Sequence, residues 1–414
     1  MMTNDPKRFG AQAFARLKAL DAFSDHPDHL ERLYLSPAHR KAADAVVAMM
    51  HEAGCDSVSI DALGTVVGRY EAKEAGRPAL LIGSHIDTVK DAGSYDGMLG
   101  VIAGIGVIEA LHEAGERLDF AVEILAFGDE ENVRFPSNLS SSRAIAGSFD
   151  FSTLDGRDEN GISLRDALIQ FGGDPDGITA LARKKEDVIG YVEMHIEQGP
   201  VLDQENRPIG IVTAISGASR RRIIVTGEAG HAGTVPMALR KDSLMAAAEM
   251  ALAIEKIGAA AENGVATIGQ MQVEPGAVNV ITGRVRFTVD ARAPRDSVRE
   301  KLVADIEATI RAIATQRKVQ VEIQPFYDSP AAPASTAIMQ GLADAMEARQ
   351  METRYLPSGA GHDAMVMGAL CPMGMMFVRC KDGISHNPAE SMTEEDAGLA
   401  IAILLDFVRS YRPT

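Results

Sequence analysis

Strand-like and helix-like segments alternate between residues 36 and 135, and this alternation constrains the fold more than any other feature of the sequence. The helical run PAHRKAADAVVAMMHEAG is followed by the strands TVVGRYE and ALLIGS, a helix over about 97–115, and the strand FAVEILAFG. Strands that alternate with helices usually pair in parallel, because each helix carries the chain back across the sheet. We therefore predict an α/β fold with a mainly parallel sheet.

The alternating pattern changes between residues 213 and 328. The order there is strand (RRIIVTG), helix (241–258), strand (VATIGQMQV), strand (RVRFTVDAR), helix (295–316) and strand (VQVEIQPF). The α/β pattern returns from about residue 335. A chain of 414 residues that is 46% hydrophobic is also too long for one simple core. We predict a catalytic domain made of residues 1–212 and 329–414, interrupted at 213–328 by a smaller α+β (βαββαβ) domain.

The charge balance excludes two classes of partner. The chain has 41 Lys and Arg against 58 Asp and Glu, a formal net charge of −17, and no block of basic residues. Nucleic acids and anionic membranes bind through clustered positive charge, so neither is an expected partner. The N-terminal MMTNDPKRFG lacks the apolar core of an export signal, and glycine and glutamate interrupt apolar runs such as MLGVIAGIGVIEAL. We expect neither export nor a membrane span.

The cysteines indicate a reducing compartment. Cys55, Cys371 and Cys380 form no CxxC pair, and three cysteines cannot make an even disulfide framework. We expect a cytoplasmic protein in which these thiols are buried and structural.

Two polar motifs follow the apolar strand ALLIGS. His85 and Asp87 in SHIDTV lie on the same side of an extended backbone, so one side chain can bind a metal while the other orients it or fixes the loop. A His-x-Asp pair alone is more often structural. Asp96 in GSYDGMLG lies in a glycine-flanked loop that opens a helix, where its two oxygens can bridge two cations. The two motifs together favour a metal site.

A third motif, AFGDEENVRF, takes an apolar strand directly into the acids Asp129, Glu130 and Glu131. Three acids at a buried strand end repel one another unless cations compensate or the turn is solvated. Adjacent acids point in different directions, so one can bind a metal while its neighbour reaches a water as general base. An isolated DEE run would favour the solvated turn, but in combination with His85 and Asp96 the run favours a metal site.

Two further histidines complete a candidate two-ion site. His195 ends a strand in YVEMHIEQGP, and His386 lies in ISHNPAE. With Asp96 as bridge, one ion can take His85 and His195, and the other Glu131 and His386. Two such ions lower the pKa of a shared water and polarise a carbonyl. We assign no role to the remaining histidines of the N-terminal part, namely His26, His29, His39, His51 and His112.

Other catalytic classes lack their motifs. The sequence has no G-x-S-x-G elbow, no P-loop, and no G-x-G-x-x-G that follows a strand with the required downstream acid. We therefore do not expect a serine hydrolase, an NTPase or a dinucleotide enzyme.

The motifs SHIDTV, GSYDG, GDEE, EMHIEQGPVL, HAGTVPM, PGAVNVI, DAR, SGAGHDA and ISHNPAE follow one another over most of the chain. Together they resemble the amidase and carbamoylase branch of the M20 metallopeptidase family, which includes N-carbamoyl-L-amino acid hydrolases, allantoate amidohydrolases and β-ureidopropionases. The resemblance implies two divalent ions, zinc or else manganese, cobalt or nickel. It implies that the ions are bound by His85, Asp96, Glu131, His195 and His386. It also implies that Asp87 supports these ligands without binding an ion, and that Glu130 is the general base.

The resemblance also implies that the 213–328 insert is a lid and that the protein forms a homodimer through this domain. His231, Asn279 and Arg292 match family residues that contact substrate: a histidine and an amide stabilise an oxyanion, and an arginine clamps a carboxylate. Without the family, Arg292 could equally form a strand-end salt bridge and Asn279 a turn. Gln198 matches a further substrate contact, and the residues Gly359 and Gly361 of SGAGHDA let the backbone approach a ligand.

The expected reaction is hydrolysis of an N-carbamoyl group on an L-amino acid, a small ureido substrate that bears a carboxylate. The rivals are allantoate amidohydrolase, an N-acyl-amino-acid amidase or peptidase of the same family, and a binding protein that has lost turnover. The sequence departs from many carbamoylases at SGASRRRIIVTG, where Arg220, Arg221 and Arg222 form a run similar to that of the allantoate enzymes. A solvated edge strand explains this run equally well.

Overall fold

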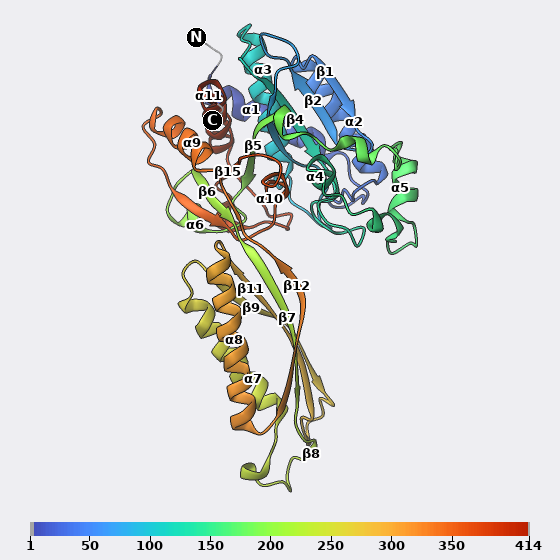
Figure 1. Ribbon diagram of the computed structural model, residues 1–414, viewed down its shortest axis with the longest axis vertical. Helices are drawn as coiled ribbons and strands as arrows, with labels where there is room; N and C mark the ends of the chain where they lie inside the picture. The colour runs from blue at the N-terminus through green and yellow to red at the C-terminus, as the bar shows by residue number, and fades with distance from the viewer. Residues whose placement is uncertain (1–3, 413–414) are drawn as a thin grey trace. The chain divides into compact units, whose positions relative to one another are not determined.

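A computed structural model describes residues 4–412, and they form two compact units (Figure 1). The larger unit comprises the described parts of Met1–Thr213 and Gly361–Thr414 together with Ala334–Leu356. The smaller unit comprises Ala214–Pro333 and Pro357–Ala360. The smaller unit is therefore an insertion in the chain of the larger one.

A nine-stranded sheet forms the centre of the larger unit, in the order β1-β2-β4-β3-β5-β15-β6-β13, with β14 paired to β6. The central pairs β4-β3, β3-β5 and β5-β15 are parallel, and the outer pairs are antiparallel. The strands are β1 Ser57–Ile60, β2 Val66–Tyr70, β3 Ala79–His85, β4 Ala121–Phe127, β5 Val188–Ile196, β6 Ile209–Ile215, β13 Ala332–Pro333, β14 Tyr355–Ser358 and β15 Met373–Val378. The predicted α/β fold with a mainly parallel central sheet is confirmed.

Helices cover the sheet because its central strands are apolar on both faces. Every residue of β3, β4 and β15 is buried, as expected for parallel strands. The helices are α1 Pro6–Asp21, α2 Pro37–Glu52, α3 Met98–Glu113, α4 Ser140–Ile145, α5 Leu164–Phe171, α6 Val201–Gln204, α9 Thr336–Glu347, α10 Asp363–Met367 and α11 Glu394–Ser410. None of the described helices is long and apolar enough to cross a membrane.

Helix α3 packs against the sheet more closely than most side chains would allow. A Cβ atom at Gly100 would lie 2.4 Å from the main-chain oxygen of Met194 on β5, so only glycine permits this approach. The first turn of α3 is thereby held beside the carboxyl end of β5. This contact places Asp96, which lies just before the helix, close to His195.

The polar segment 136–188, whose runs SNLSSS, DGRDENG and GGDPDG predict loops, is more ordered than that composition indicates. It contains α4, α5 and three short 3-10 helices at Phe151–Asp155, Ile178–Leu181 and Lys185–Asp187. Helix α5 has a Ser163 hydroxyl at its N-terminus, which accepts a hydrogen bond from the amide of Asp166, and a left-handed glycine at its C-terminus. These capping residues are the same Ser and Gly that a composition argument assigns to loops.

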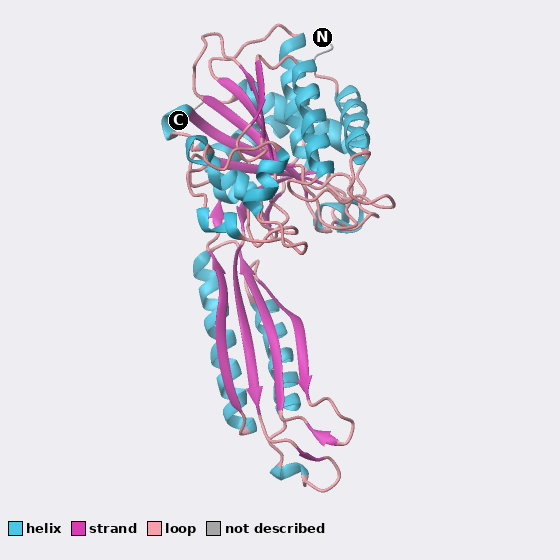
Figure 2. Ribbon diagram, turned by 90° about the vertical axis from the view of Figure 1, so that its right-hand side faces the viewer, coloured by secondary structure: helices cyan, strands magenta, loops and turns pink. Residues whose placement is uncertain are grey.

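The smaller unit is a four-stranded antiparallel sheet, in the order β12-β7-β11-β9, with two helices on one face (Figure 2). Its elements are β7 Gly217–Thr226, α7 Ser243–Ala260, β9 Val265–Glu274, β11 Arg284–Ala293, α8 Asp296–Arg317 and β12 Gln320–Ser329. A two-stranded ribbon of β8 Gly230–His231 and β10 Val280–Ile281 lies beyond one end of the sheet. Alternate residues of β11, such as Val285 and Phe287, are buried against the helices.

Candidate metal centre

The carboxyl ends of three neighbouring parallel strands bring most of the candidate ligands together. Strand β3 ends at His85, which lies in register with Phe127, the last residue of β4. Glu130 and Glu131 therefore leave β4 beside His85, and His195 is the penultimate residue of β5. Ligand sites in α/β sheets commonly lie at this edge, and the predicted metal ligands and the predicted base of the larger unit converge there.

Asp96 lies between the two predicted ligand pairs. Its Oδ1 is 3.4 Å from Nε2 of His85 and 3.2 Å from Nε2 of His195. Its Oδ2 is 3.5 Å from Nε2 of His386, which in turn is 3.4 Å from Oε2 of Glu131. Each carboxylate oxygen of Asp96 thus faces one pair, which is the arrangement expected of a ligand shared by two cations.

The spacing of these atoms fits divalent cations. The ligand atoms of His85, Asp96 and His195 lie within 4.8 Å of one another, as do those of Asp96, Glu131 and His386. Two ligands at about 2.1 Å from a tetrahedral zinc ion are about 3.4 Å apart, close to the separations between Asp96 and its neighbours. The donor set therefore suits two cations that share Asp96.

The orientation of the buried imidazoles fits the same role. The Nδ1 atoms of His85 and His195 lie 3.0 Å and 2.9 Å from the main-chain oxygens of Asp87 and Ile196. Each ring can donate its Nδ1 proton to a carbonyl and turn the Nε2 lone pair toward the cluster. Nε2 of His195 is buried and forms no well-aligned hydrogen bond within the described residues, so it is available to a cation.

The three consecutive acids after β4 have different surroundings. Asp129 has a left-handed backbone (φ 66°) and accepts hydrogen bonds from the hydroxyls of Ser137 and Ser140. Glu130 and Glu131 face His85 instead, and Oε2 of Glu130 is 3.8 Å from its Nε2. Asp129 therefore shapes the turn that presents its two neighbours.

Asp87 fixes this turn from the other side. Its two carboxylate oxygens accept the main-chain N–H groups of Glu130 and Glu131, each at 3.3 Å. The carboxylate of Asp87 thus orients the strand end that carries the acids, while its main-chain oxygen orients His85. Of the two roles that the sequence leaves open for Asp87, its side chain occupies the one that fixes the loop.

The cluster carries more negative charge than its own cations neutralise. Burial, with the nearby charge of Asp96, raises the pKa of Glu131 to about 8, and burial raises the pKa of Glu130 well above its usual value. Burial alone would raise the pKa of Asp96 too, but the charge of His195 lowers it far below the usual range. Protons or metal cations must therefore compensate the acids.

Several residues that support the site carry no sequence signal. The side-chain amide of Gln198 and the hydroxyl of Ser385 donate to Oδ2 of Asp96 at 2.7 and 2.5 Å. The fully buried Arg32 donates to the main-chain oxygen of Ile86 at 3.0 Å, and Glu390 accepts the main-chain N–H of Asp96. Only Gln198 was among the predicted site residues. Arg32 and Glu390 act on main-chain atoms, and Ser385 acts through its hydroxyl on a residue far away in the sequence. Residue spacing does not encode such contacts.

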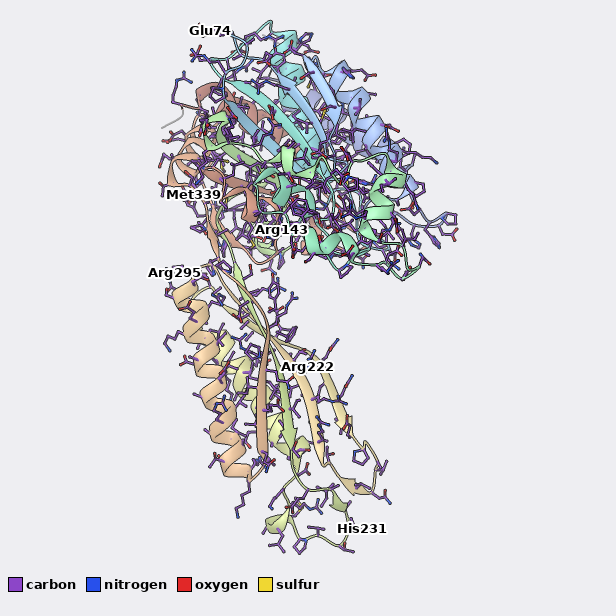
Figure 3. The ribbon with its side chains drawn as sticks, turned by 45° about the vertical axis from the view of Figure 1, so that its right-hand side comes forward. Glu74, Arg143, Arg222, His231, Arg295 and Met339 are labelled. Carbon is purple, nitrogen blue, oxygen red and sulfur yellow. The ribbon has the colours of Figure 1, made fainter. Side chains whose placement is uncertain are left out.

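In the smaller unit, His231 and Asn279 lie in one place and Arg292 in another. His231 is exposed on the β8-β10 ribbon (Figure 3), and the main-chain oxygen of Asn279 accepts the N–H of Ala232. Arg292 is at the opposite end of β11, where it donates to both oxygens of Asp290 at 2.8 and 3.0 Å and to the main-chain oxygen of Gly359 at 2.8 Å. These predicted substrate contacts therefore do not form one cluster within the smaller unit.

The predicted contacts Gly359 and Gly361 have free space in front of them. A Cβ atom at either position would meet no atom within 4 Å, so packing alone does not require glycine there. Gly359 also lines a hollow of about 680 Å³ with Arg292, Arg220 and Arg222. The space and the charge of this hollow suit a small anionic ligand.

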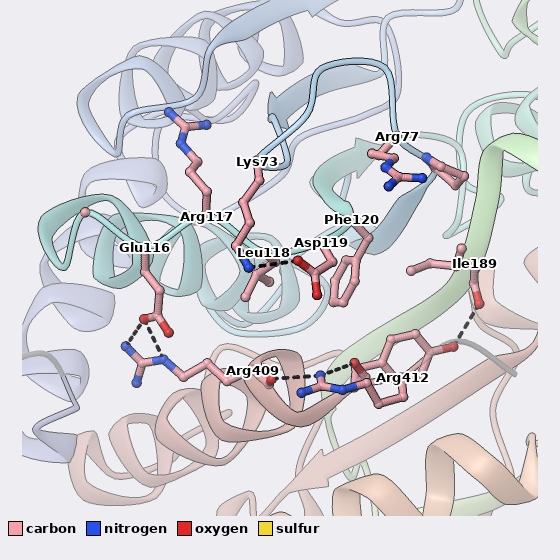
Figure 4. Close-up of a pocket in the computed structure, with 13 residues that line it drawn as sticks. Lys73, Arg77, Glu116, Arg117, Leu118, Asp119, Phe120, Ile189, Arg409 and Arg412 are labelled. Carbon is pink, nitrogen blue, oxygen red and sulfur yellow. Dashed lines mark hydrogen bonds and ion pairs between the residues drawn. The ribbon is translucent and has the colours of Figure 1, made fainter.

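A cavity of about 790 Å³ in the larger unit lies at the opposite edge of the sheet (Figure 4). Its lining includes Phe120, which precedes β4, and Ile189 near the start of β5. Several cations line it and are paired with acids, as in Lys73 with Asp119 and Arg409 with Glu116. No predicted site residue lines this cavity, so the metal-ligand cluster remains the candidate centre.

Comparisons with known proteins agree with the motifs. Allantoate deiminase of Arabidopsis thaliana is 39% identical, over 96% of this chain and 82% of its own length. N-carbamoyl-L-amino acid amidohydrolase of Geobacillus stearothermophilus is 38% identical, over 95% of this chain and 97% of its own length. The crystal structure of an amidase of the hydantoinase/carbamoylase family from Burkholderia multivorans has a TM-score of 0.90 and 32% identity, covering 98% of each chain.

The family assignment rests on most of the sequence. The profile of Peptidase family M20/M25/M40 matches residues 81–410, a span that contains every candidate ligand from His85 to His386. The resemblance drawn from the motifs is thereby confirmed. The chain belongs to peptidase family M20/M25/M40.

Proposed function

We propose that the protein is a two-metal amidohydrolase that cleaves the C–N bond of a ureido group, most readily that of an N-carbamoyl-L-amino acid. The observation that carries this proposal is the position of Asp96, with one oxygen facing His85 and His195 and the other facing His386. The relative named N-carbamoyl-L-amino acid amidohydrolase, which this chain matches over 97% of its length, supports the substrate class.

The ligands proposed for the two ions are His85, Asp96, Glu131, His195 and His386, and the ions are zinc or else manganese, cobalt or nickel. When bound, such ions polarise a carbonyl and lower the pKa of water. Imidazole suits zinc and nickel, and carboxylates broaden the choice toward manganese. The mixed ligand set thus supports a metal of this class without selecting one.

Glu130 is proposed as the general base. Its Oε2 is 3.8 Å from Nε2 of His85, at the rim of the cluster and beside the atoms that face the ions. Its carboxylate can take a proton from the attacking water and deliver it to the leaving nitrogen. The carboxylate of Asp87 accepts a hydrogen bond from the main-chain N–H of Glu130 at 3.3 Å. This contact fixes the backbone position from which the Glu130 side chain extends.

Arg292 is proposed to bind the carboxylate of the substrate. Asp290 takes two of its N–H groups and Gly359 takes a third, which leaves two of the five guanidinium N–H groups for a ligand. The contact with Asp290 orients the guanidinium in advance, so less conformational freedom is lost when a carboxylate binds. A substrate carboxylate that binds Arg292 does not occupy the ions, so the ureido group can bind there.

The second candidate substrate is allantoate, because two further arginines, Arg220 and Arg222, line the same hollow as Arg292. Arg220 donates to Asp290 at 2.9 Å, whereas the guanidinium of Arg222 lies 5.3 Å from the ring of Phe326 and has no ion pair among the described residues. Relatives named allantoate deiminase are 39% identical to this chain. A larger substrate with several carbonyl groups would use such additional donors.

We further propose that the smaller unit is a lid and dimerisation domain, and that the protein is a homodimer. Arg292 lies eight residues along β11 from Arg284, which is at the His231 end of the sheet, and a strand rises about 3.3 Å per residue. The two predicted contacts are thus more than about 25 Å apart within one subunit. A small substrate that touches both must therefore use the partner subunit's His231.

A reducing, cytoplasmic location is the proposal that the thiols support. Cys55, Cys371 and Cys380 are buried and free. Burial raises the pKa of each thiol, to about 12, 12 and 11, so they remain protonated and unreactive. An equal count of free thiols in protein unfolded without reductant and in protein unfolded after reduction would support this proposal.

The experiment that tests the function is a hydrolysis screen. The metal-free protein is reloaded separately with zinc, manganese, cobalt or nickel. Ammonia release is measured from N-carbamoyl-L-amino acids and allantoate, and release of the free amino acid is measured from N-acetyl-L-amino acids. Turnover of the carbamoyl compounds above the other two supports the main proposal, and preference for allantoate supports the second. Hydrolysis of none of them with any metal would refute the proposed class.

A further inference from the structure

The carboxylate of Glu390 joins the loop that carries Asp96 to the loop that carries His386. Its Oε1 accepts the main-chain N–H of Tyr95 at 2.8 Å and that of Asp96 at 3.1 Å. The main-chain N–H of Glu390 donates to the main-chain oxygen of Asn387 at 2.9 Å, which closes the turn directly after His386. One side chain therefore links the backbones of two candidate ligands that are far apart in sequence.

The packing around Glu390 is specific to this contact. The residue is only 6% exposed, so its carboxylate is shielded from water and its two hydrogen bonds are correspondingly strong. A Cβ atom at position 93 would lie 2.3 Å from the carboxyl carbon and 2.4 Å from Oε1 of Glu390. Gly93 therefore leaves the space that the carboxylate fills, and any larger residue would displace it.

Little else fixes these two ligands relative to each other. The side chain of His386 is 51% exposed and its backbone is left-handed (φ 53°). The contacts from Gln198 and Ser385 reach Oδ2 of Asp96, the oxygen that faces His386 and that an ion would occupy. The contact from Glu390 reaches the main chain of Asp96 instead, so it is compatible with metal binding.

We propose that Glu390 is a positioning residue that holds Asp96 and His386 at the separation needed for the second ion, the one that also uses Glu131. This inference rests on the proposed metal centre. Glu390 does not touch the ion or the substrate: it acts through the backbone of Asp96 and through the turn after His386. Residues that orient metal ligands in this way typically change metal affinity by roughly 10- to 100-fold.

The test compares Glu390→Ala with Glu390→Gln in the metal-loaded protein. Metal stoichiometry and affinity are measured by competition with a chromophoric chelator, and the cobalt-loaded protein is examined by absorption spectroscopy. Glu390→Ala should lower the affinity for the more weakly bound ion by at least about tenfold and alter the cobalt spectrum. Glu390→Gln retains an oxygen that can accept both N–H groups and should stay within about threefold of wild type.

A matched control separates positioning from general stability. Asp61 is a half-buried carboxylate at the β1-β2 hairpin that likewise accepts two loop N–H groups, from Leu63 at 2.8 Å and Thr65 at 2.9 Å. Asp61→Ala should lower the unfolding temperature and leave metal affinity unchanged. Gly93→Ala approaches Glu390 from its other side and should weaken the second ion as Glu390→Ala does.

The outcomes distinguish this inference from the proposed function. If the wild-type protein binds two ions and Glu390→Ala binds both with unchanged affinity, the inference fails and the metal centre stands. An affinity loss as large in Glu390→Gln as in Glu390→Ala would also refute it, because hydrogen-bond acceptance would then not be the cause. If the wild-type protein binds no ions, the proposed function itself fails.

Discussion

Mixed dimers test whether His231 serves the active site of its own subunit or that of its partner. Glu130→Gln inactivates the base in one subunit, and His231→Ala removes the imidazole in the other; two different affinity tags isolate the heterodimer. Because His231 and Arg292 are more than about 25 Å apart in one subunit, we expect each site to combine Glu130 of one subunit with the partner's His231. One of the two sites is then intact, and the heterodimer should show about half of the wild-type kcat for ammonia release.

The matched control places both substitutions in one subunit and pairs it with a wild-type subunit. If His231 acts on the partner, neither site of this dimer is intact and activity falls to the level of the single variants. If His231 acts in its own subunit, the two dimers exchange their results: the first is inactive and the control keeps half of its activity. That exchange would refute the argument from the length of β11. A monomer by sedimentation would refute the dimer itself.

Three further substitutions test separate parts of the account. Glu130→Gln should leave metal content nearly unchanged and lower kcat by at least about a hundredfold, because it removes a base; loss of metal would instead make Glu130 a ligand. Arg292→Lys should raise KM roughly 10- to 100-fold for carboxylate-bearing substrates, and far less for the matching carboxamide; equal losses on both would assign Arg292 to structure. Burial, with Arg32 nearby, lowers the pKa of His39 to about 3, and its Nδ1 accepts the N–H of Leu35. Because the folded-state pKa lies below the unfolded value, this imidazole contributes stability above about pH 6.5 that is lost as pH falls toward 3, up to roughly 5 kcal/mol. Urea unfolding of the metal-free His39→Gln protein should therefore depend less on pH in that window, and an unchanged slope would contradict the cause given.

The sequence predicted those parts of the fold that rest on regular side-chain patterns. The apolar strands β3, β4 and β5, and the helices α2 and α3, have regular side-chain patterns, so their positions were predicted closely. The segment 136–188 was not, because the serines and glycines that cap its short helices look like loop residues. The order of outer strands in the sheet, such as β2 beside β4, also has no local signature.

The candidate site likewise has residues that sequence patterns predict and residues that they do not. His85, Asp96 and His195 each follow or precede a recognisable element, so the shared carboxyl edge of parallel strands predicts their proximity. Arg32 and Glu390 act on the main-chain atoms of other loops, and such contacts depend on tertiary packing that one sequence does not reveal. The distance between His231 and Arg292 likewise emerges only once the register of β11 is known.

The most direct test of the central claim is the metal content of the wild-type protein and of Asp96→Ala, measured by elemental analysis after loading with zinc or manganese and removal of excess ion. The wild-type protein should hold about two ions per subunit, and Asp96→Ala should lose at least one of them together with ammonia release, because both ions share that carboxylate. Two fully retained ions in Asp96→Ala, or a fully active wild-type protein that holds none, would contradict the account.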